Sequence, residues 1–155
     1  MGKEMVLASS ESMKNSLEAI RCGRAGLNLH RKQLLARVPN SGEWVCLNKH
    51  TVTVKDIAYL SAATLHEFAL LRGKNEDILF HGTRYHCEFT GNLLARLKAR
   101  KLRLVAHTHP DNGTVTPSAA DRRFLKLIGQ EKSIIVSYIT GIEKEFTSNV
   151  FEEIM

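Results

Sequence analysis

The stretch LRLVAHTHPDNGTVTPSAADRRFLKLIG, Leu102–Gly129, predicts a strand, a turn and a helix in succession. Its first eight residues are typical of a strand whose apolar side chains share one face, namely Leu102, Leu104 and Ala106. Pro110 cannot donate a hydrogen bond to a strand ladder, so we expect the strand to end there. Ser118 is typical of the residue before a helix and Gly129 of the residue that ends one.

The rest of the chain also alternates between helical and extended patterns. We expect helices over residues 10–38 with a break at Gly23 and Gly26, over 55–66, and from Thr90 as cap to residue 100. We expect extended segments over 44–54 and 77–82, and a closing hairpin over 133–151. The segment EFALL (67–71) either continues the second helix or begins a strand. These elements predict a mixed α/β domain over residues 43–155, preceded by a helical extension over residues 1–42.

Composition is that of an ordinary globular protein. The 155 residues suffice for one domain, and 43% are hydrophobic and 25% charged. No window approaches the roughly 20 apolar residues that a membrane-spanning helix needs, so no membrane association is expected. Three scattered cysteines, without the spacing of a metal or redox pair, predict free thiols in a reducing cytoplasm. The net charge of +6 makes the surface mildly basic.

Two histidines and one carboxylate come together in the opening stretch. His107 and His109 lie two residues apart on the predicted strand, so their imidazoles should point to the same face. The turn and the helix that follow should return Asp121, in the first helical turn, to the side of the two rings. Two imidazoles and a carboxylate are a ligand set of catalytic zinc, with water in the fourth position. Zinc lowers the pKa of that water to about 7.

Each half of this pattern has a simpler interpretation. Two histidines that lie two residues apart are more often surface or structural residues. Ser118 and Asp121 have the spacing of a helix capping box. Neither interpretation explains why the two halves are adjacent in the chain. Capping and metal binding are also compatible, because a fixed helix start would aim Asp121 at the histidines.

The pattern HTHP…S..D resembles the signature of the JAMM metalloproteases, also called JAB or MPN-plus domains, over about Trp44 to Phe151. The resemblance implies a JAB/MPN-like (cytidine-deaminase-like) fold, a curved mixed sheet flanked by helices. It implies Zn²⁺ on His107, His109 and Asp121, with Ser118 orienting water or stabilising the oxyanion. Thr108 also matches, because the family has Ser or Thr between the histidines.

The family's general base is a glutamate upstream of the histidines. In the family this glutamate lies where a helix gives way to the following strand. The segment HEFALLRG fits that position and indicates Glu67, with Glu43, Glu76 and Glu88 as weaker candidates. One departure is that eight residues separate His109 from Ser118, where the family usually has seven. The extra residue falls in DNGTVT, where a turn can absorb it.

The sequence therefore predicts a zinc metallopeptidase or isopeptidase of the compact prokaryotic type. Only 39 residues separate Glu67 from His107, which leaves little room for the insertions with which eukaryotic relatives hold ubiquitin chains. The expected substrate is a protein or peptide, such as a ubiquitin-like conjugate or precursor. The alternatives are a noncatalytic interaction domain of the same fold and a RadC-like, nucleic-acid-associated role, which TPS (116–118) and the net charge suggest.

Three other features have both a functional and a simpler interpretation. His66, His81 and His86 could line the substrate site, but partly exposed histidines are the simpler expectation. The basic run ARLKARKLR (95–103) could bind phosphates or an acidic partner. It is better explained as a solvated helix face, because no aromatic residues interleave with it and a nucleic-acid partner is not expected. The apolar stripe from Met13 to Leu35 should pack on the domain, with a homodimer contact as the alternative.

Overall fold

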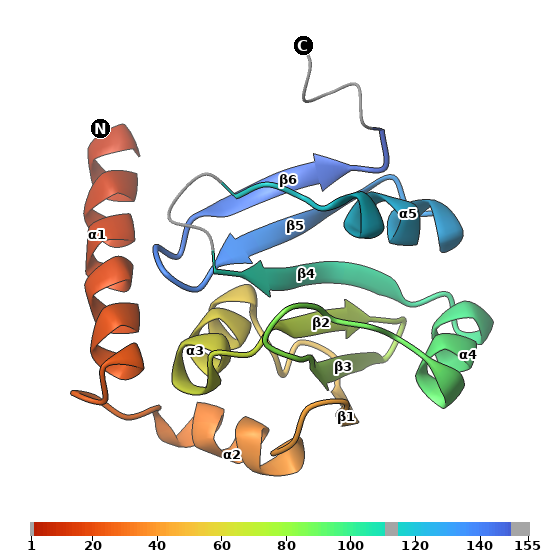
Figure 1. Ribbon diagram of the computed structural model, residues 1–155, viewed down its shortest axis with the longest axis horizontal. Coiled ribbons are helices and arrows are strands. Elements are labelled where there is room, and N and C mark those ends of the chain that lie inside the picture. The colour runs from red at the N-terminus through yellow and green to blue at the C-terminus, as the bar shows by residue number, and fades with distance from the viewer. Residues whose placement is uncertain (1, 111–114, 150–155) are drawn as a thin grey trace.

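The computed structural model describes the backbone of residues 2–110 and 115–149, and the side chains of 11–110 and 115–149. Within these ranges the chain is a mixed α/β structure with a six-stranded sheet and five helices (Figure 1). The helices are α1 Gly2–Arg21, α2 Leu29–Arg37, α3 Val54–Thr64, α4 Gly91–Ala99 and α5 Ala119–Leu127. The strands are β1 Trp44–Asn48, β2 Phe68–Arg72, β3 Glu76–His81, β4 Arg103–His109, β5 Lys132–Ser137 and β6 Glu143–Thr147.

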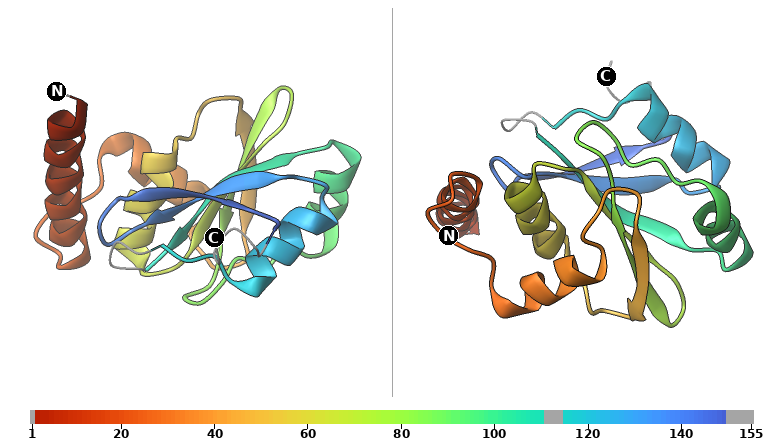
Figure 2. Two further views of the ribbon diagram at one scale, coloured as in Figure 1. Left: turned by 90° about the horizontal axis from the view of Figure 1, so that it is seen from above. Right: turned by 60° about the horizontal axis from the view of Figure 1, so that its bottom comes forward.

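The sheet order is β1-β3-β2-β4-β5-β6, and β4–β5 is the parallel pair in a sheet whose other neighbours are antiparallel. Helices α1, α2 and α3 lie on one side of the sheet, and α4 and α5 lie on the other (Figure 2). Each side has its own apolar cluster, so the inner strands β2, β3, β4 and β5 are largely buried on both faces. Such burial explains why β2 reads as the continuous apolar run FALL rather than as an alternating pattern.

The N-terminal helices pack on the α3 side of the sheet. Leu17 of α1 and Leu34 of α2 are buried in the same cluster as Leu60 of α3. Arg21 at the end of α1 donates to the carbonyl oxygen of Tyr138, at 2.8 Å, beyond the end of β5. The break after α1 and the packing of the stripe on the domain are as the sequence predicts. No helix in the described part of the chain is long and apolar enough to cross a membrane.

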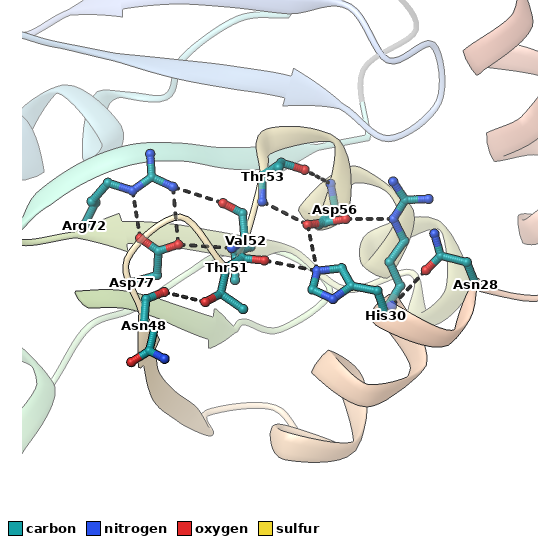
Figure 3. Close-up of polar contacts among 10 residues, drawn as sticks. Asn28, His30, Asn48, Thr51, Val52, Thr53, Asp56, Arg72 and Asp77 are labelled. Carbon is teal, nitrogen blue, oxygen red and sulfur yellow. Dashed lines mark hydrogen bonds and ion pairs between the residues drawn. The ribbon is translucent and has the colours of Figure 1, made fainter. Parts of the chain in front are cut away.

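The expectation of an extended segment over residues 44–54 is wrong beyond Asn48, where β1 ends and a turn leads into α3. Val54 is the first residue of α3, because Thr53 and Asp56 form a capping box in which each side chain accepts from the other's backbone N–H. This capping outweighs the β preference of a run of β-branched residues. Asp56 is buried and also pairs with His30, as Figure 3 shows.

A second buried carboxylate joins the end of β2 to the start of α3. Asp77 is fully buried, and the Arg72 guanidinium donates to it at 2.7 Å (Figure 3). The backbone N–H of Val52 donates to the same carboxylate at 3.0 Å. Burial by itself would raise the pKa of Asp77, but these hydrogen bonds and the Arg72 charge outweigh it and lower that pKa.

Strand β4 corrects one expectation about its faces. Leu70 pairs with Ala106 but Leu71 pairs with Leu104, so a bulge interrupts the alternation of side chains along β4. As a result Leu104 belongs to the cluster on the α4–α5 side, whereas Ala106 belongs to the other. The segment EFALL contributes a strand, β2, and the predicted closing hairpin is present as β5 and β6.

Candidate metal centre

The carboxyl end of β4 and the start of α5 bring together three side chains that could hold a metal ion. His107 Nε2 lies 3.1 Å from His109 Nε2 and 3.2 Å from Asp121 Oδ1, and His109 Nε2 lies 3.3 Å from Asp121 Oδ2. His107 is buried, and the other two side chains are half-buried. In the described part of the chain, this is the group of three or more His, Cys, Asp or Glu side chains arranged to hold a metal ion.

The start of α5 fixes the carboxylate. Ser118 caps the helix: its hydroxyl oxygen accepts from the Asp121 N–H at 3.0 Å, and Asp121 Oδ2 accepts from the Ser118 N–H at 2.9 Å. The capping box is therefore present, and the same carboxylate faces both histidines. The predicted extra loop residue falls in 111–116, of which 111–114 lie outside the described residues.

Thr108, between the two histidines, points to the opposite side of β4. Its hydroxyl oxygen accepts from the backbone N–H of Phe68 at 2.8 Å and lies 2.7 Å from the Ser61 hydroxyl oxygen of α3. Thr108 and Ser61 are fully buried. We call these two contacts of the Thr108 hydroxyl the clamp. It joins β4 to β2 and α3, and it fixes the backbone of Phe68, the residue that follows Glu67.

The three ligand atoms have the spacing that a small metal ion requires. A tetrahedral zinc ion with bonds of about 2.0–2.1 Å holds its ligand atoms roughly 3.3 Å apart, which is close to the observed separations. Three atoms that carry lone pairs repel one another at such distances unless protons or a cation lie among them. Nδ1 of His107 is buried without a hydrogen-bond partner among the described residues. Metal binding through Nε2 requires that this Nδ1 carry the proton.

Burial of Asp121 tends to raise its pKa, but the hydrogen bonds from His107 and His109, the charge of His107 and the Ser118 N–H outweigh burial. The pKa of Asp121 therefore lies well below its usual range, and the group is a carboxylate at neutral pH. Burial also raises the pKa of the Cys87 thiol, and the negative charges of Glu67 and Asp121 add to this effect. Cys87 is therefore a neutral thiol beside the site, and all three cysteines are free.

Glu67 lines the same pocket as the three metal-binding side chains and Ser118, in a cavity of about 260 Å³. It is 5% exposed and immediately precedes β2. Its N–H donates to the Thr83 carbonyl at 2.8 Å, and its carbonyl accepts from the Gly82 N–H at 2.7 Å. These two hydrogen bonds tie Glu67 to the segment after β3.

The weaker glutamate candidates have different surroundings. Glu88 also lines the pocket, but it is exposed. Glu43 accepts a hydrogen bond from the Asn40 N–H, and Glu76 pairs with Arg96 at 2.9 Å. Glu67 is therefore the buried glutamate of the pocket in the described part of the chain.

One wall of the pocket is apolar and aromatic, which the sequence pattern does not reveal. Tyr85, Phe89 and Phe124 line it, and the rings of Phe89 and Phe124 lie 4.9 Å apart. The segment between β3 and α4 lacks periodicity, so no sequence signal places its residues here; only the position of Phe124 on the apolar stripe of α5 hints at burial.

Of the three histidines that the sequence suggested for the substrate site, only His86 lines the pocket. His66 is half-buried, with its Nδ1 2.8 Å from His81 Nε2. The expectation of partial exposure is wrong for His81, which is buried, stacks on Phe68 and has Nδ1 2.7 Å from the Val38 carbonyl oxygen. This buried position lowers the pKa of His81, chiefly by desolvation of the charged form.

Comparison of the chain with protein-family models, with curated proteins and with solved structures found no match. The assignment of a function therefore depends on the geometry and the chemistry of the candidate metal centre.

Proposed function

We propose that this chain is a zinc-dependent hydrolase of amide bonds in proteins or peptides, with a JAB/MPN-like fold. The observation that carries the proposal is the meeting of His107, His109 and Asp121 in one pocket with Glu67 and Ser118. A structural histidine pair needs no carboxylate beside it, and a helix cap needs no histidines. A hydrolytic metal site with two histidine ligands and one carboxylate ligand explains why they lie together, with a buried glutamate beside them as base.

His107, His109 and Asp121 would hold the zinc ion, and three protein ligands leave a position for water. When bound, zinc would supply a Lewis acid that lowers the pKa of water to about 7 and polarises the scissile carbonyl. Asp121 contributes a negative charge at neutral pH, and the neighbouring histidines and the Ser118 N–H stabilise that charge. A ligand set of two nitrogens and one oxygen suits zinc, as it does several other divalent first-row metals.

Glu67 would act as the general base. Its carboxylate accepts a proton from the attacking water and then delivers it to the amine that leaves. Ser118 has a separate task. Its oxygen already accepts the Asp121 N–H, so its O–H remains to donate to the developing oxyanion.

The apolar wall of the pocket supports a polypeptide substrate. Tyr85 is 78% exposed, and Phe89 and Phe124 are also part of the lining. Such side chains suit the flexible tail of a ubiquitin-like protein or another extended peptide. A nucleic-acid substrate is not proposed for this pocket.

The test is hydrolysis of a panel of fluorogenic peptides and ubiquitin-like fusions by the zinc-loaded protein. Glu67→Gln should abolish cleavage of any substrate found, because the amide cannot accept the proton, while the bound zinc remains. Glu88→Gln is the matched control, since Glu88 lines the same pocket and is exposed, and this variant should retain activity. Full activity of Glu67→Gln, or loss of activity in Glu88→Gln alone, would overturn the assignment of the base.

A further inference from the structure

A second cleft lies at the end of the sheet away from the metal centre. Figure 1 shows the course of strand β4, which runs from Arg103 to His109. The histidines are at its last residues, whereas Arg103, Leu104 and Val105 at its start line this cleft. The cleft is about 500 Å³ in volume and is bounded by the end of β2, the turn before β4 and the start of β5. We call it the basic cleft because of its cationic lining, namely Lys49, Arg72, Lys74, Lys101, Arg103 and Lys132.

Most of this charge is not neutralised within the protein. Among the described residues, the lining holds six cationic side chains and one carboxylate, Glu145. Arg72 pairs with buried Asp77, and Lys132 lies 3.6 Å from Glu145. The side chains of the other four cations, Lys49, Lys74, Lys101 and Arg103, have no hydrogen bond or ion pair within the described residues, and all four are exposed. Gathering like charges in a concave site raises the local potential and attracts an anion.

Lys101 adopts a backbone conformation that lysine rarely takes. Helix α4 ends at Ala99, and Lys101 has φ 52°, in the left-handed region, while the Leu102 N–H donates to the Leu97 carbonyl oxygen at 2.9 Å. Glycine is the usual residue at this position of a helix end. The strained backbone keeps a cation on the wall of the basic cleft, and such strain is typical of functional positions.

The floor of the basic cleft is preformed by buried hydrogen bonds. Gln130 donates to the carbonyl oxygens of Leu104 and Lys132, each at 2.7 Å, and its side-chain oxygen accepts from the Leu104 N–H at 2.8 Å. Ser133 also donates to the Leu104 carbonyl oxygen, at 2.7 Å. A ligand would therefore meet a fixed surface, so little ordering of the protein opposes its binding.

The chemistry of the floor favours a polypeptide as the anion. Val105 and Ile134 are half-buried parts of the lining, and they offer contacts to apolar side chains between acidic ones. A phosphodiester backbone has no apolar side chains that could make such contacts. In addition, no aromatic side chain lines the cleft among the described residues, so unpaired bases have no stacking partner.

We propose that the basic cleft binds an acidic polypeptide segment in which aspartates or glutamates alternate with apolar residues. The carboxylates pair with the unpartnered cations, Lys101 among them, and the apolar side chains lie on the floor. This binding does not depend on a metal ion at His107, His109 and Asp121.

The experiment measures binding of a fluorescein-labelled peptide of alternating glutamate and leucine by fluorescence anisotropy, with short duplex DNA as the competing probe. The test variant is Lys74→Glu with Arg103→Glu, which reverses two exposed charges of the basic cleft. The control variant is Arg24→Glu with Lys32→Glu, which changes the net charge equally at exposed positions outside the cleft.

The wild-type chain should bind the peptide saturably, and more weakly as salt rises. The test variant should bind at least about tenfold more weakly, and the control variant within about twofold of wild type. Equal loss in both variants would reduce the effect to net charge, and absence of saturable binding at low salt would also overturn the proposal. Tighter binding of the duplex, lost in the test variant, would make the basic cleft a nucleic-acid site instead.

Discussion

Replacing Thr108 by valine removes one hydroxyl and nearly preserves the shape of the side chain. In the native protein this hydroxyl oxygen accepts from the Phe68 N–H at 2.8 Å and lies 2.7 Å from the Ser61 hydroxyl oxygen, in a region without solvent access. Valine at position 108 would leave both groups without this partner. The Phe68 N–H has the greater loss, because it belongs to the fixed backbone of β2 and cannot turn to another acceptor.

The expected cost follows from these two groups. A buried donor or acceptor that loses its partner costs about 1–3 kcal/mol. Ser61 lies in α3, so its hydroxyl can turn to a carbonyl of the preceding helical turn, which reduces its share. We therefore expect Thr108→Val to lower the free energy of unfolding by about 2 kcal/mol, a substantial part of the roughly 5–15 kcal/mol typical of a domain.

Urea denaturation measures this cost, and about 2 kcal/mol corresponds to a shift of roughly 1 M in the midpoint at a typical slope. Thr108→Ser is the control, because it keeps the hydroxyl and should lose only about 1 kcal/mol for the buried methyl group. In the double variant with Ser61→Ala, the cost should be less than the sum of the two single variants, since each removes the same hydrogen bond. A cost below about 0.5 kcal/mol for Thr108→Val, or an equal cost for Thr108→Ser, would refute the clamp.

Three further predictions concern stability. Because the native pKa of Asp77 is lowered, its contribution to the free energy of unfolding is present above the unfolded pKa of about 3.9 and lost as pH falls through the lower native value. In urea titrations Asp77→Asn should therefore be less stable than wild type at pH 7, and the two stabilities should converge in acid. A difference in stability that does not depend on pH would contradict this. Gly82→Ala should lower the free energy of unfolding by about 1–3 kcal/mol in thermal or urea denaturation, because a Cβ there would lie 2.9 Å from the Glu67 carbonyl oxygen and closer still to two other atoms. Unchanged stability would contradict this, because it would mean that the neighbouring atoms move aside without cost. Lys101→Gly should raise the free energy of unfolding by about 1 kcal/mol by relieving the left-handed backbone, and yet weaken peptide binding; a loss of stability would refute the strain.

Local patterns predict much of this fold because local physics decides it. Ser118 and Asp121 lie in one helical turn, so their capping box can be read from a spacing of three residues. The alternation that carries His107 and His109 to one face is likewise a property of a single strand. For the same reason the helix after Thr53 is visible in retrospect, because its capping box with Asp56 is as local as that of α5.

Other features depend on contacts between distant segments. The bulge that separates Leu104 from Ala106 arises where β4 pairs with β2, and nothing within β4 announces it. The burial of His81 requires the Val38 carbonyl oxygen, which is supplied by the end of α2. The basic cleft likewise combines the ends of separate strands, so the run ARLKARKLR by itself could not distinguish cations paired with Glu76 from those left unpaired.

The zinc content of the purified protein, measured by elemental analysis, tests the central claim most directly. The account predicts one zinc ion per chain. The zinc should be lost when His109 is replaced by alanine, because His109 is a proposed ligand, and retained when Glu67 is replaced by glutamine, because Glu67 is not. Absence of zinc after supplementation at neutral pH, or zinc that persists in His109→Ala, would contradict the metal centre and with it the proposed hydrolase.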